Sequence, residues 1–236
     1  MIAIKKISKY FGTYAALRHF SLDLKAGQKC CLVGKTGSGK TTLLRLIAGL
    51  EQPDAGEIII DGRLASSRSA MVPPHQRQIG MVFQNLAIWP HLTAVRHLVM
   101  VMNSHQSRRE KEEKALGILS SLDMSEYARS YPGMLSGGQR QKLAIARLLA
   151  SQPRIALCDE PYAHLDPASK EAVRSLVNNW ITESHITFIM VTHDPLEDFS
   201  FFDTMVALRQ GSLVAWDKPG DLQDLFRMMD PGAEGP

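Results

Sequence analysis

The chain has 236 residues, 44% of them hydrophobic and 22% charged, which is enough for one large domain or two tightly joined lobes. Its formal net charge of +3 is too small to indicate nucleic-acid binding through a basic stripe, so we expect no nucleic-acid partner. The cysteines Cys30, Cys31 and Cys158 stand in short apolar runs without metal-ligand spacing, and we expect buried thiols in a reducing compartment.

The first residues, MIAIKKISKYFG, lack the long apolar core of a signal peptide, so we expect a cytoplasmic protein. The longest uncharged run, residues 79–95, contains polar side chains and a proline. It therefore does not predict a transmembrane helix. If the protein works at a membrane, another subunit must therefore provide the span.

The sequence predicts strands and one helix in the first part of the chain. Phe20, Leu22 and Leu24 alternate with polar residues. This two-residue period is typical of a strand with one buried and one solvent-exposed face. The run KCCLV (29–33) is typical of a strand buried on both faces, and a glycine-rich turn leads from it into a helix, TTLLRLIAG, that ends at Gly49. The dipeptide DG within EIIIDGRL predicts a hairpin, and hence an antiparallel β-piece.

The middle of the chain, from Thr93 to Ala150, has mostly helical patterns, and its charged run RREKEEK indicates a solvated helix face. Buried-strand composition then returns in RIALCD, ITFIMV and TMVAL, with a helical stretch after Pro167. We therefore predict an α/β core lobe, about residues 1–90 and 150–236, interrupted by a helical lobe at about 91–149.

One glycine-rich segment between the buried strand and the helix matches G-x-x-x-x-G-K-[ST] in full. Its residues are Gly34, Lys35, Thr36, Gly37, Ser38, Gly39, Lys40 and Thr41. In such a loop the backbone N–H groups wrap phosphates, the lysine places a cation on the β and γ oxygens, and the last hydroxyl binds Mg²⁺. The segment predicts a site for a nucleoside triphosphate and Mg²⁺, and the family resemblance given below implies that the nucleotide is ATP.

The segment IALCDEP is an apolar strand that ends in two carboxylates. Asp159, at the strand end, can hold Mg²⁺ through its water shell, and Glu160 can polarise the water that attacks the γ-phosphate. An acid pair is common on protein surfaces, but ligands of α/β sheets bind at the carboxyl ends of the strands. The position therefore favours a catalytic interpretation.

A third motif, LSGGQ (135–139), lies between the phosphate loop and the acidic strand and is followed by RQKLAIARLLA. With these three motifs in this order, the chain resembles the ATP-binding subunit of an ATP-binding-cassette (ABC) transporter. Gln84 in VFQ resembles the glutamine of the family's Q-loop, Asp166 in AHLD its D-loop, and His193 in VTHD its switch histidine. Phe11 falls where the family places an aromatic ring under adenine.

The resemblance implies a P-loop NTPase core with a parallel sheet, an antiparallel β-subdomain and an inserted helical subdomain. In this family two ATPase domains pair head to tail, and the signature of one caps the nucleotide on the phosphate loop of the other. The chain holds one copy of each motif, so we expect a dimer, most simply a homodimer. By resemblance, Thr42, Asp166, Ser136, Gly137, Gly138 and Gln139 contact nucleotide, Gln84 contacts Mg²⁺, and Gln84 and His193 assist Glu160 in hydrolysis.

The segment VFQNLAIWPHLT is similar to importers of polyamines, ferric iron or sulfate, which implies an integral membrane permease as partner and leaves room for a solute-binding protein. Such a subunit is peripheral on the inner face of the cell membrane. Many of those importers carry a C-terminal regulatory β-barrel, which we do not expect here because the sequence ends about where the ATPase core ends. The alternatives are a soluble cassette ATPase, as in iron–sulfur cluster assembly, an export or lipid-extraction ATPase, or an unrelated kinase or GTPase.

The segment AIWPHLT raises a further question about Trp89. Exposed aromatic residues often anchor interfaces, so the helical lobe near Trp89 is a candidate groove for a short permease helix. Trp89 can equally pack inside the lobe, and the sequence leaves both interpretations open.

Overall fold

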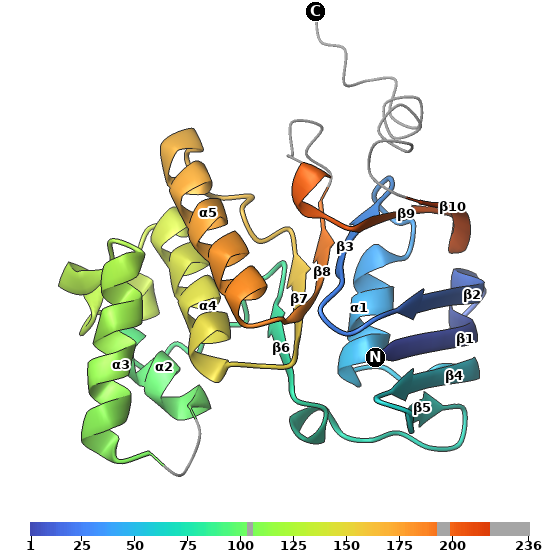
Figure 1. The fold of residues 1–236 in the computed structure, drawn as a ribbon, viewed down its shortest axis with the longest axis horizontal. Helices are drawn as coiled ribbons and strands as arrows, with labels where there is room; N and C mark the ends of the chain where they lie inside the picture. The colour runs from blue at the N-terminus through green and yellow to red at the C-terminus, as the bar shows by residue number, and fades with distance from the viewer. Residues whose placement is uncertain (103–105, 193–198, 218–236) are drawn as a thin grey trace, which may run out of the picture. The chain divides into compact units, whose positions relative to one another are not determined.

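A computed structural model of the chain describes residues 1–102, 106–192 and 199–217. It divides into two compact units, each described separately below. The first unit contains residues 1–79, 155–159 and 185–236, and the second contains residues 80–154 and 160–184. Figure 1 shows the elements in chain order.

An antiparallel sheet of the first unit has the strand order β2-β1-β4-β5. Its strands are β1 (Ile2–Phe11), β2 (Tyr14–Leu24), β4 (Ala55–Ile60) and β5 (Arg63–Ser67). The side chains of Phe20, Leu22 and Leu24 are buried, and Ser21 and Asp23 are exposed, which confirms the predicted alternation in β2. The predicted hairpin is confirmed as well, because Asp61 and Gly62, both with positive φ, join β4 to β5.

The second sheet of this unit is mainly parallel and has the order β10-β9-β3-β8-β7. Its strands are β3 (Lys29–Val33), β7 (Ile155–Asp159), β8 (Thr187–Val191), β9 (Thr204–Arg209) and β10 (Ser212–Asp217). The strand β3 pairs in parallel with β8 and β9, β7 pairs in parallel with β8, and β10 runs antiparallel to β9. Every residue of β7 and β8 is buried, as the continuous apolar runs predicted.

The helix α1 (Lys40–Ala48) follows β3 through the glycine-rich loop. Gly49, with φ of 76°, ends it in the left-handed conformation, as predicted. Short 3₁₀ helices, η1 (Pro74–Gln76) and η4 (Phe199–Phe201), complete the first unit. Parallel strands place the carboxyl ends of β3, β7 and β8 at one edge of the sheet.

The second unit is mostly helical (Figure 1). It consists of α2 (Ala94–Val101), α3 (Arg108–Ser121), η2 (Ser125–Tyr127), η3 (Pro132–Met134), α4 (Gly137–Ser151) and α5 (Pro167–Glu183), and β6 (Ile79–Val82) leads into it. The core of α4 is continuously buried from Leu143 to Ala150. Among the described residues, no helix combines the length and the apolar character needed to cross a membrane.

All three cysteines lie within the described ranges, and their side chains are buried, as predicted.

Candidate functional site

The glycine-rich loop, residues 34–41, lies at the carboxyl end of β3 and opens α1. Gly34 has φ of +146°, and a Cβ there would stand 2.3 Å from the carbonyl oxygen of Leu208. At Gly39, with φ of +105°, a Cβ would stand 2.4 Å from the carbonyl oxygen of Ala16. Both positions therefore require glycine. No side chain caps α1, so its first backbone N–H groups face the loop and suit an anion.

The ammonium group of Lys40 lies inside this loop. Its Nζ donates to the carbonyl oxygens of Gly34 at 2.5 Å and of Lys35 at 3.0 Å, and to Ser38 Oγ at 3.4 Å. The residue is only 7% exposed. The loop thus surrounds a buried cation, which is the charge that a bound phosphate requires. The side chains of Lys35 and Thr36 are exposed, and Thr42 is half-buried.

Thr41 and Asp159 meet between α1 and the end of β7. The Thr41 hydroxyl donates to Asp159 Oδ2 at 2.7 Å, although 118 residues separate the two in sequence. Asp159 is 2% exposed. The two side chains offer a hydroxyl and a carboxylate oxygen, which are ligands that a hard divalent cation prefers. The sequence assigned both residues to Mg²⁺, and the structure places them in direct contact; the metal assignment itself stays a prediction.

Two aromatic residues close the β1–β2 hairpin next to the loop. Phe11 pairs with Tyr14 across the hairpin, and the two residues are 47% and 52% exposed. The Tyr14 hydroxyl donates to the carbonyl oxygen of Gly37 at 2.5 Å, which ties the hairpin to the phosphate loop. The ammonium of Lys9 lies 5.3 Å from the centre of the Phe11 ring. The sequence indicated Phe11 but gave no local signal for Tyr14.

Glu160 follows Asp159 directly and belongs to the second unit. Its φ of 52° is left-handed, a conformation that costs a residue with a Cβ on the order of 1 kcal/mol. Strain of this kind at a polar residue is concentrated at functional sites. Ten other non-glycine residues of the described chain also have positive φ, however, so this conformation assigns no role to Glu160, and its catalytic role stays a prediction.

The LSGGQ segment begins α4. Ser136 Oγ accepts a hydrogen bond from the backbone N–H of Gln139 at 3.2 Å, and Gln139 Oε1 accepts one from the backbone N–H of Ser136 at 2.8 Å. This capping box fixes the helix start, and its S-x-x-Q spacing is a local signal that sequence reasoning missed. A Cβ on Gly137 would meet nothing within 4 Å, whereas one on Gly138 would stand 3.2 Å from the carbonyl oxygen of His164.

Asp166 caps α5, because its Oδ1 accepts a hydrogen bond from the backbone N–H of Ser169 at 3.0 Å. Hydrogen bonds from the backbone and side chain of Ser169 hold the pKa of the Asp166 carboxyl below its usual value. The helix α4 is tied to the segment that precedes Asp166 by Gln141, which is 1% exposed. Gln141 donates through Nε2 to the carbonyl oxygen of Pro161, and its Oε1 lies 3.2 Å from His164 Nδ1.

Gln84 is exposed in the turn that follows β6. Further along, Trp89 packs within the second unit, because its ring stacks on His97 with centroids 5.4 Å apart and the guanidinium of Arg147 lies 5.0 Å from its centre. Of the two interpretations left open for Trp89, the structure favours packing inside the unit. His193 lies outside the described residues.

A pocket of about 420 Å³ opens in the second unit beside these motifs. Its lining residues come from the segment after Gln84, from η3, from the start of α4 and from the segment before α5; they are Asn85, Leu86, Ile88, Pro90, Pro132, Gly133, Gly137, Arg140 and His164. Two large apolar side chains, Tyr131 and Met134, stand 47% and 73% exposed on either side of Pro132 and Gly133. Neither side chain is itself a lining residue of the pocket, but both flank its η3 residues in sequence. We use the name η3 groove for the pocket together with these two exposed side chains.

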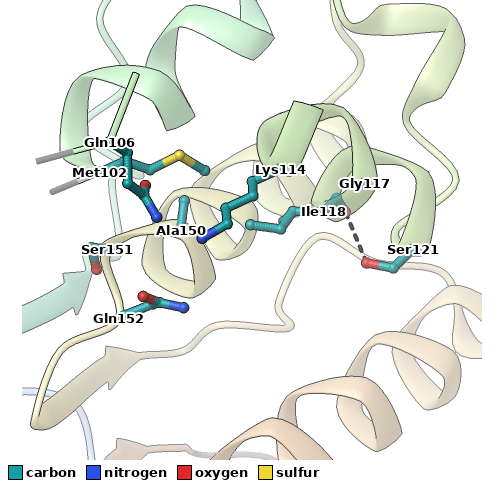
Figure 2. A pocket seen from close by; sticks show the side chains of 9 residues that line it. All are labelled: Met102, Gln106, Lys114, Gly117, Ile118, Ser121, Ala150, Ser151 and Gln152. Carbon is teal, nitrogen blue, oxygen red and sulfur yellow. Dashed lines mark hydrogen bonds between the residues drawn. The ribbon is translucent and has the colours of Figure 1, made fainter. Parts of the chain in front are cut away.

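A second pocket, of about 440 Å³, lies at the opposite end of α4 (Figure 2). Figure 2 shows Lys114 extending from α3 toward Ala150 at the end of α4, and among the described lining residues it is the one charged side chain. The predicted solvated face of α3 is confirmed on its outer side, where Arg109 and Glu113 pair at 2.9 Å. Glu110 instead completes a capping box with Ser107. None of the sequence motifs borders this pocket.

The first unit thus brings Phe11, the phosphate loop, Thr41 and Asp159 together around one cradle. The second unit holds Gln84, Ser136–Gln139, Glu160 and Asp166 on segments that α4 connects. Three residues that bind these segments together, Tyr14, Gln141 and Arg147, have no local sequence signal, because their partners are distant in the chain.

Comparisons with known proteins agree with this geometry. An Fe(3+) ions import ATP-binding protein FbpC of Pseudomonas fluorescens is 40% identical over 221 residues, which cover 94% of this chain and 62% of that protein. A probable sulfate/thiosulfate import ATP-binding protein CysA of Chlorella vulgaris is 37% identical over 228 residues, covering 94% of this chain and 93% of that protein. The chain spans between 60% and 64% of the length of several further curated import proteins.

A solved dimeric structure, a post-hydrolysis state of the ATP-binding cassette MJ0796 bound to ADP and Pi, matches with a TM-score of 0.83. The match has 31% sequence identity and covers 92% of this chain and 98% of that one. It bears out the predicted combination of parallel sheet, antiparallel sheet and helices. Residues 17–163 match the family described as ABC transporter, and this range includes the phosphate loop, LSGGQ and the acidic pair. The chain belongs to the ABC transporter family.

Proposed function

We propose that the chain is an ATP-hydrolysing subunit that dimerises on MgATP and drives solute transport, most simply import, through a separate membrane permease. The observation that carries the proposal is the cradle of Lys40, Thr41 and Asp159. A buried ammonium inside a glycine loop, beside a hydroxyl–carboxylate pair 2.7 Å apart, fits a triphosphate with its cation. The solved relative bound to ADP and Pi supports a nucleotide as ligand.

Each part of the cradle has a proposed role. Lys40 and the loop N–H groups bind the phosphates, and Thr41 and Asp159 hold Mg²⁺, directly or through its water shell. The oxygen donors of Thr41 and Asp159 fit that ion, which neutralises phosphate charge when bound. Glu160 accepts the proton of the attacking water, and Phe11 stacks on the adenine ring. Such a stack contributes on the order of 1–3 kcal/mol by analogy with base stacking on aromatic side chains.

The remaining sequence-predicted residues keep their proposed roles. Gln84 and His193 assist hydrolysis, and Gln84 also contacts Mg²⁺. The other proposed nucleotide contacts are Lys35, Thr36, Gly37, Ser38, Thr42 and Asp166. We also keep the proposed division into a core lobe (about 1–90 and 150–236) and a helical lobe (about 91–149).

The signature residues Ser136, Gly137, Gly138 and Gln139 are proposed to cap the nucleotide of a second ATPase subunit. The half-buried glycines Gly137 and Gly138 stand at the start of a 15-residue helix, where backbone N–H groups suit an anion. The dimeric form of the solved cassette supports this pairing. One copy of each motif per chain makes a homodimer with two equivalent sites the simplest assembly.

A permease is the proposed partner of the η3 groove. The relatives named as import ATP-binding proteins support a role in import, and an ATPase that drives import must contact a membrane subunit on the inner face of the membrane. The described lining residues of the groove are mainly apolar, with Asn85, Arg140 and His164 as its polar side chains, which suits a short amphipathic helix. A solute-binding protein remains a further proposed partner of the complex.

The docking proposal predicts that Met134→Glu strongly reduces co-purification with the permease from detergent-solubilised membranes. Met134 is 73% exposed, so the fold tolerates the change, but a buried unpaired charge in an apolar interface costs several kcal/mol. We expect at least a tenfold loss of the complex, since about 1.4 kcal/mol is a factor of ten.

The matched control is Met100→Glu, a methionine of the same unit that is 66% exposed and belongs to α2, which supplies no lining residue to the pocket, whereas Met134 directly follows the lining residue Gly133. Full retention of the permease by Met134→Glu, with the same thermal unfolding as the wild type, would exclude this docking surface. A wild-type chain that brings no membrane protein with it would instead favour a soluble cassette ATPase.

A further inference from the structure

The backbone of the segment after Gln84 is held in an unfavourable conformation. Leu86 and Ala87 are consecutive and have φ of 62° and 42°, both in the left-handed region. Residues with a Cβ rarely adopt this conformation, and two in succession are rarer still. Such a segment, which we call the 86–89 loop, keeps its shape only where its surroundings hold it.

Arg147, on α4, forms hydrogen bonds with the backbone of both strained residues. Arg147 Nη1 donates to the carbonyl oxygen of Ala87 at 2.6 Å, and its Nη2 donates to that of Leu86 at 3.0 Å. The arginine is 7% exposed, and burial lowers its pKa. A planar guanidinium can donate to two neighbouring carbonyl groups at once, which a lysine ammonium cannot do with the same geometry.

A buried histidine of α2 fixes the other end of the loop. The backbone N–H of Trp89 donates to His97 Nε2 at 3.1 Å, and His97 Nδ1 lies 2.8 Å from the carbonyl oxygen of Thr93. These partners assign the proton of neutral His97 to Nδ1, because Nε2 must accept. His97 is 0% exposed, and the Trp89 ring packs on both His97 and Arg147.

We propose that Arg147 and His97 are positioning residues that lock the 86–89 loop and make it move as one body with α4. The helix α4 starts at the signature residue Ser136 and carries Arg147 near its other end. The loop supplies Leu86 and Ile88 to the η3 groove. If α4 moves at the signature, Arg147 would therefore move the 86–89 loop with it. Leu86 and Ile88 would then shift within the η3 groove, with no separate movement of the loop.

The lock itself is tested by amide hydrogen exchange on the purified full chain. In Arg147→Lys, which keeps the charge but loses the forked donor, we expect the amides of residues 86–89 to exchange at least tenfold faster. His97→Phe, which keeps a buried ring but removes the acceptor, should have this effect at the Trp89 amide first. Arg129→Lys, an exposed arginine of the same unit, is the control. Unchanged exchange in both Arg147→Lys and His97→Phe would overturn the proposal.

A spectroscopic signature separates positioning from general destabilisation. Burial lowers the pKa of His97, and the charge of Arg147 and, to a smaller extent, that of His91 lower it further, against the raising effect of the hydrogen bonds with Thr93 and Trp89. Protonation at Nε2 would oppose the Trp89 N–H, so acidification should release the loop at a pH below about 6.5, the ordinary value for histidine. With Trp180 and Trp216 replaced by phenylalanine, the fluorescence of Trp89 should report this step.

We expect the fluorescence step in the wild-type background and its loss in His97→Phe. A step of the same midpoint in His97→Phe would contradict the assignment to His97.

The link from the loop to the groove rests on the proposed function and is measured in the assembled permease complex. Arg147→Lys should reduce permease-dependent stimulation of ATP hydrolysis at least fivefold, with binding of MgATP retained. Full stimulation in Arg147→Lys would overturn the link. A wild-type chain that shows no stimulation would contradict the proposed function instead, and the exchange measurement would still decide the lock.

Discussion

Replacing Glu160 by glutamine is expected to slow ATP hydrolysis by about 10² to 10⁴ while leaving MgATP bound, because a positioned general base contributes a factor of this size. Glutamine keeps the volume and a hydrogen-bonding oxygen but cannot accept the proton of the attacking water. The strained φ of 52° at this residue is unchanged by the substitution, so the backbone geometry is preserved. The measurement is single-turnover hydrolysis by the purified variant alongside equilibrium binding of a fluorescent ATP analogue.

The control for this experiment is Glu126→Gln, an exposed carboxylate of the same unit outside every motif. We expect wild-type hydrolysis from it. Turnover by Glu160→Gln within a factor of three of wild type would show that another group activates the water.

Replacing Lys40 by alanine is expected to weaken ATP binding about 10- to 100-fold, because a hydrogen bond to a charged group contributes about 1.5–3 kcal/mol. Hydrolysis should fall further, by about 10² to 10³, since a fixed donor to the reacting phosphate acts mainly in the transition state. Lys40 also bonds the loop carbonyls of Gly34 and Lys35, so the variant loses part of the loop's own support.

Lys25→Ala is a suitable control, because Lys25 is an exposed lysine of the same unit, in the turn before β3. Calorimetry with MgATP measures affinity, and circular dichroism checks the fold. Wild-type affinity in folded Lys40→Ala would mean that the glycine loop does not hold the triphosphate.

The sequence predicted those parts of the fold that depend on local patterns. The strands β3, β7 and β8 are continuous apolar runs, and the turn at Asp61 and Gly62 has a two-residue signature, so each could be read without tertiary information. The phosphate loop was equally readable, because its glycine spacing and its position after a buried strand are local. These features explain why the family could be recognised before the structure was known.

Contacts between distant side chains could not be predicted in the same way. Tyr14 stands 23 residues from Gly37, and Arg147 stands 60 residues from Ala87. A buried arginine is uncommon, so an arginine within LAIAR is by default expected to face solvent. Trp89 was ambiguous for the same reason, because an aromatic residue in a loop can cover a partner's surface or fill a gap inside its own unit. Only the positions of His97 and Arg147 decide between the two.

The central claim is that the signature of one chain completes the nucleotide site of another, and mixing two inactive variants tests it most directly. Lys40→Ala removes the cation of the phosphate loop and keeps the signature. Gly137→Asp keeps the loop and sets a negative charge at the signature, where an added Cβ has open space within 4 Å apart from its chain neighbours and the backbone of its own helix. Both chains also carry Glu160→Gln, so that bound ATP is not hydrolysed during the measurement.

A mixed dimer holds one site in which both halves are intact, the loop of the Gly137→Asp chain and the signature of the Lys40→Ala chain. The measurement is the molar mass by light scattering after size-exclusion chromatography in saturating MgATP. We expect each variant alone to remain monomeric and the mixture to form dimers. A mixture that stays monomeric, with both variants shown by circular dichroism to be folded, would contradict the sharing of ATP between two chains.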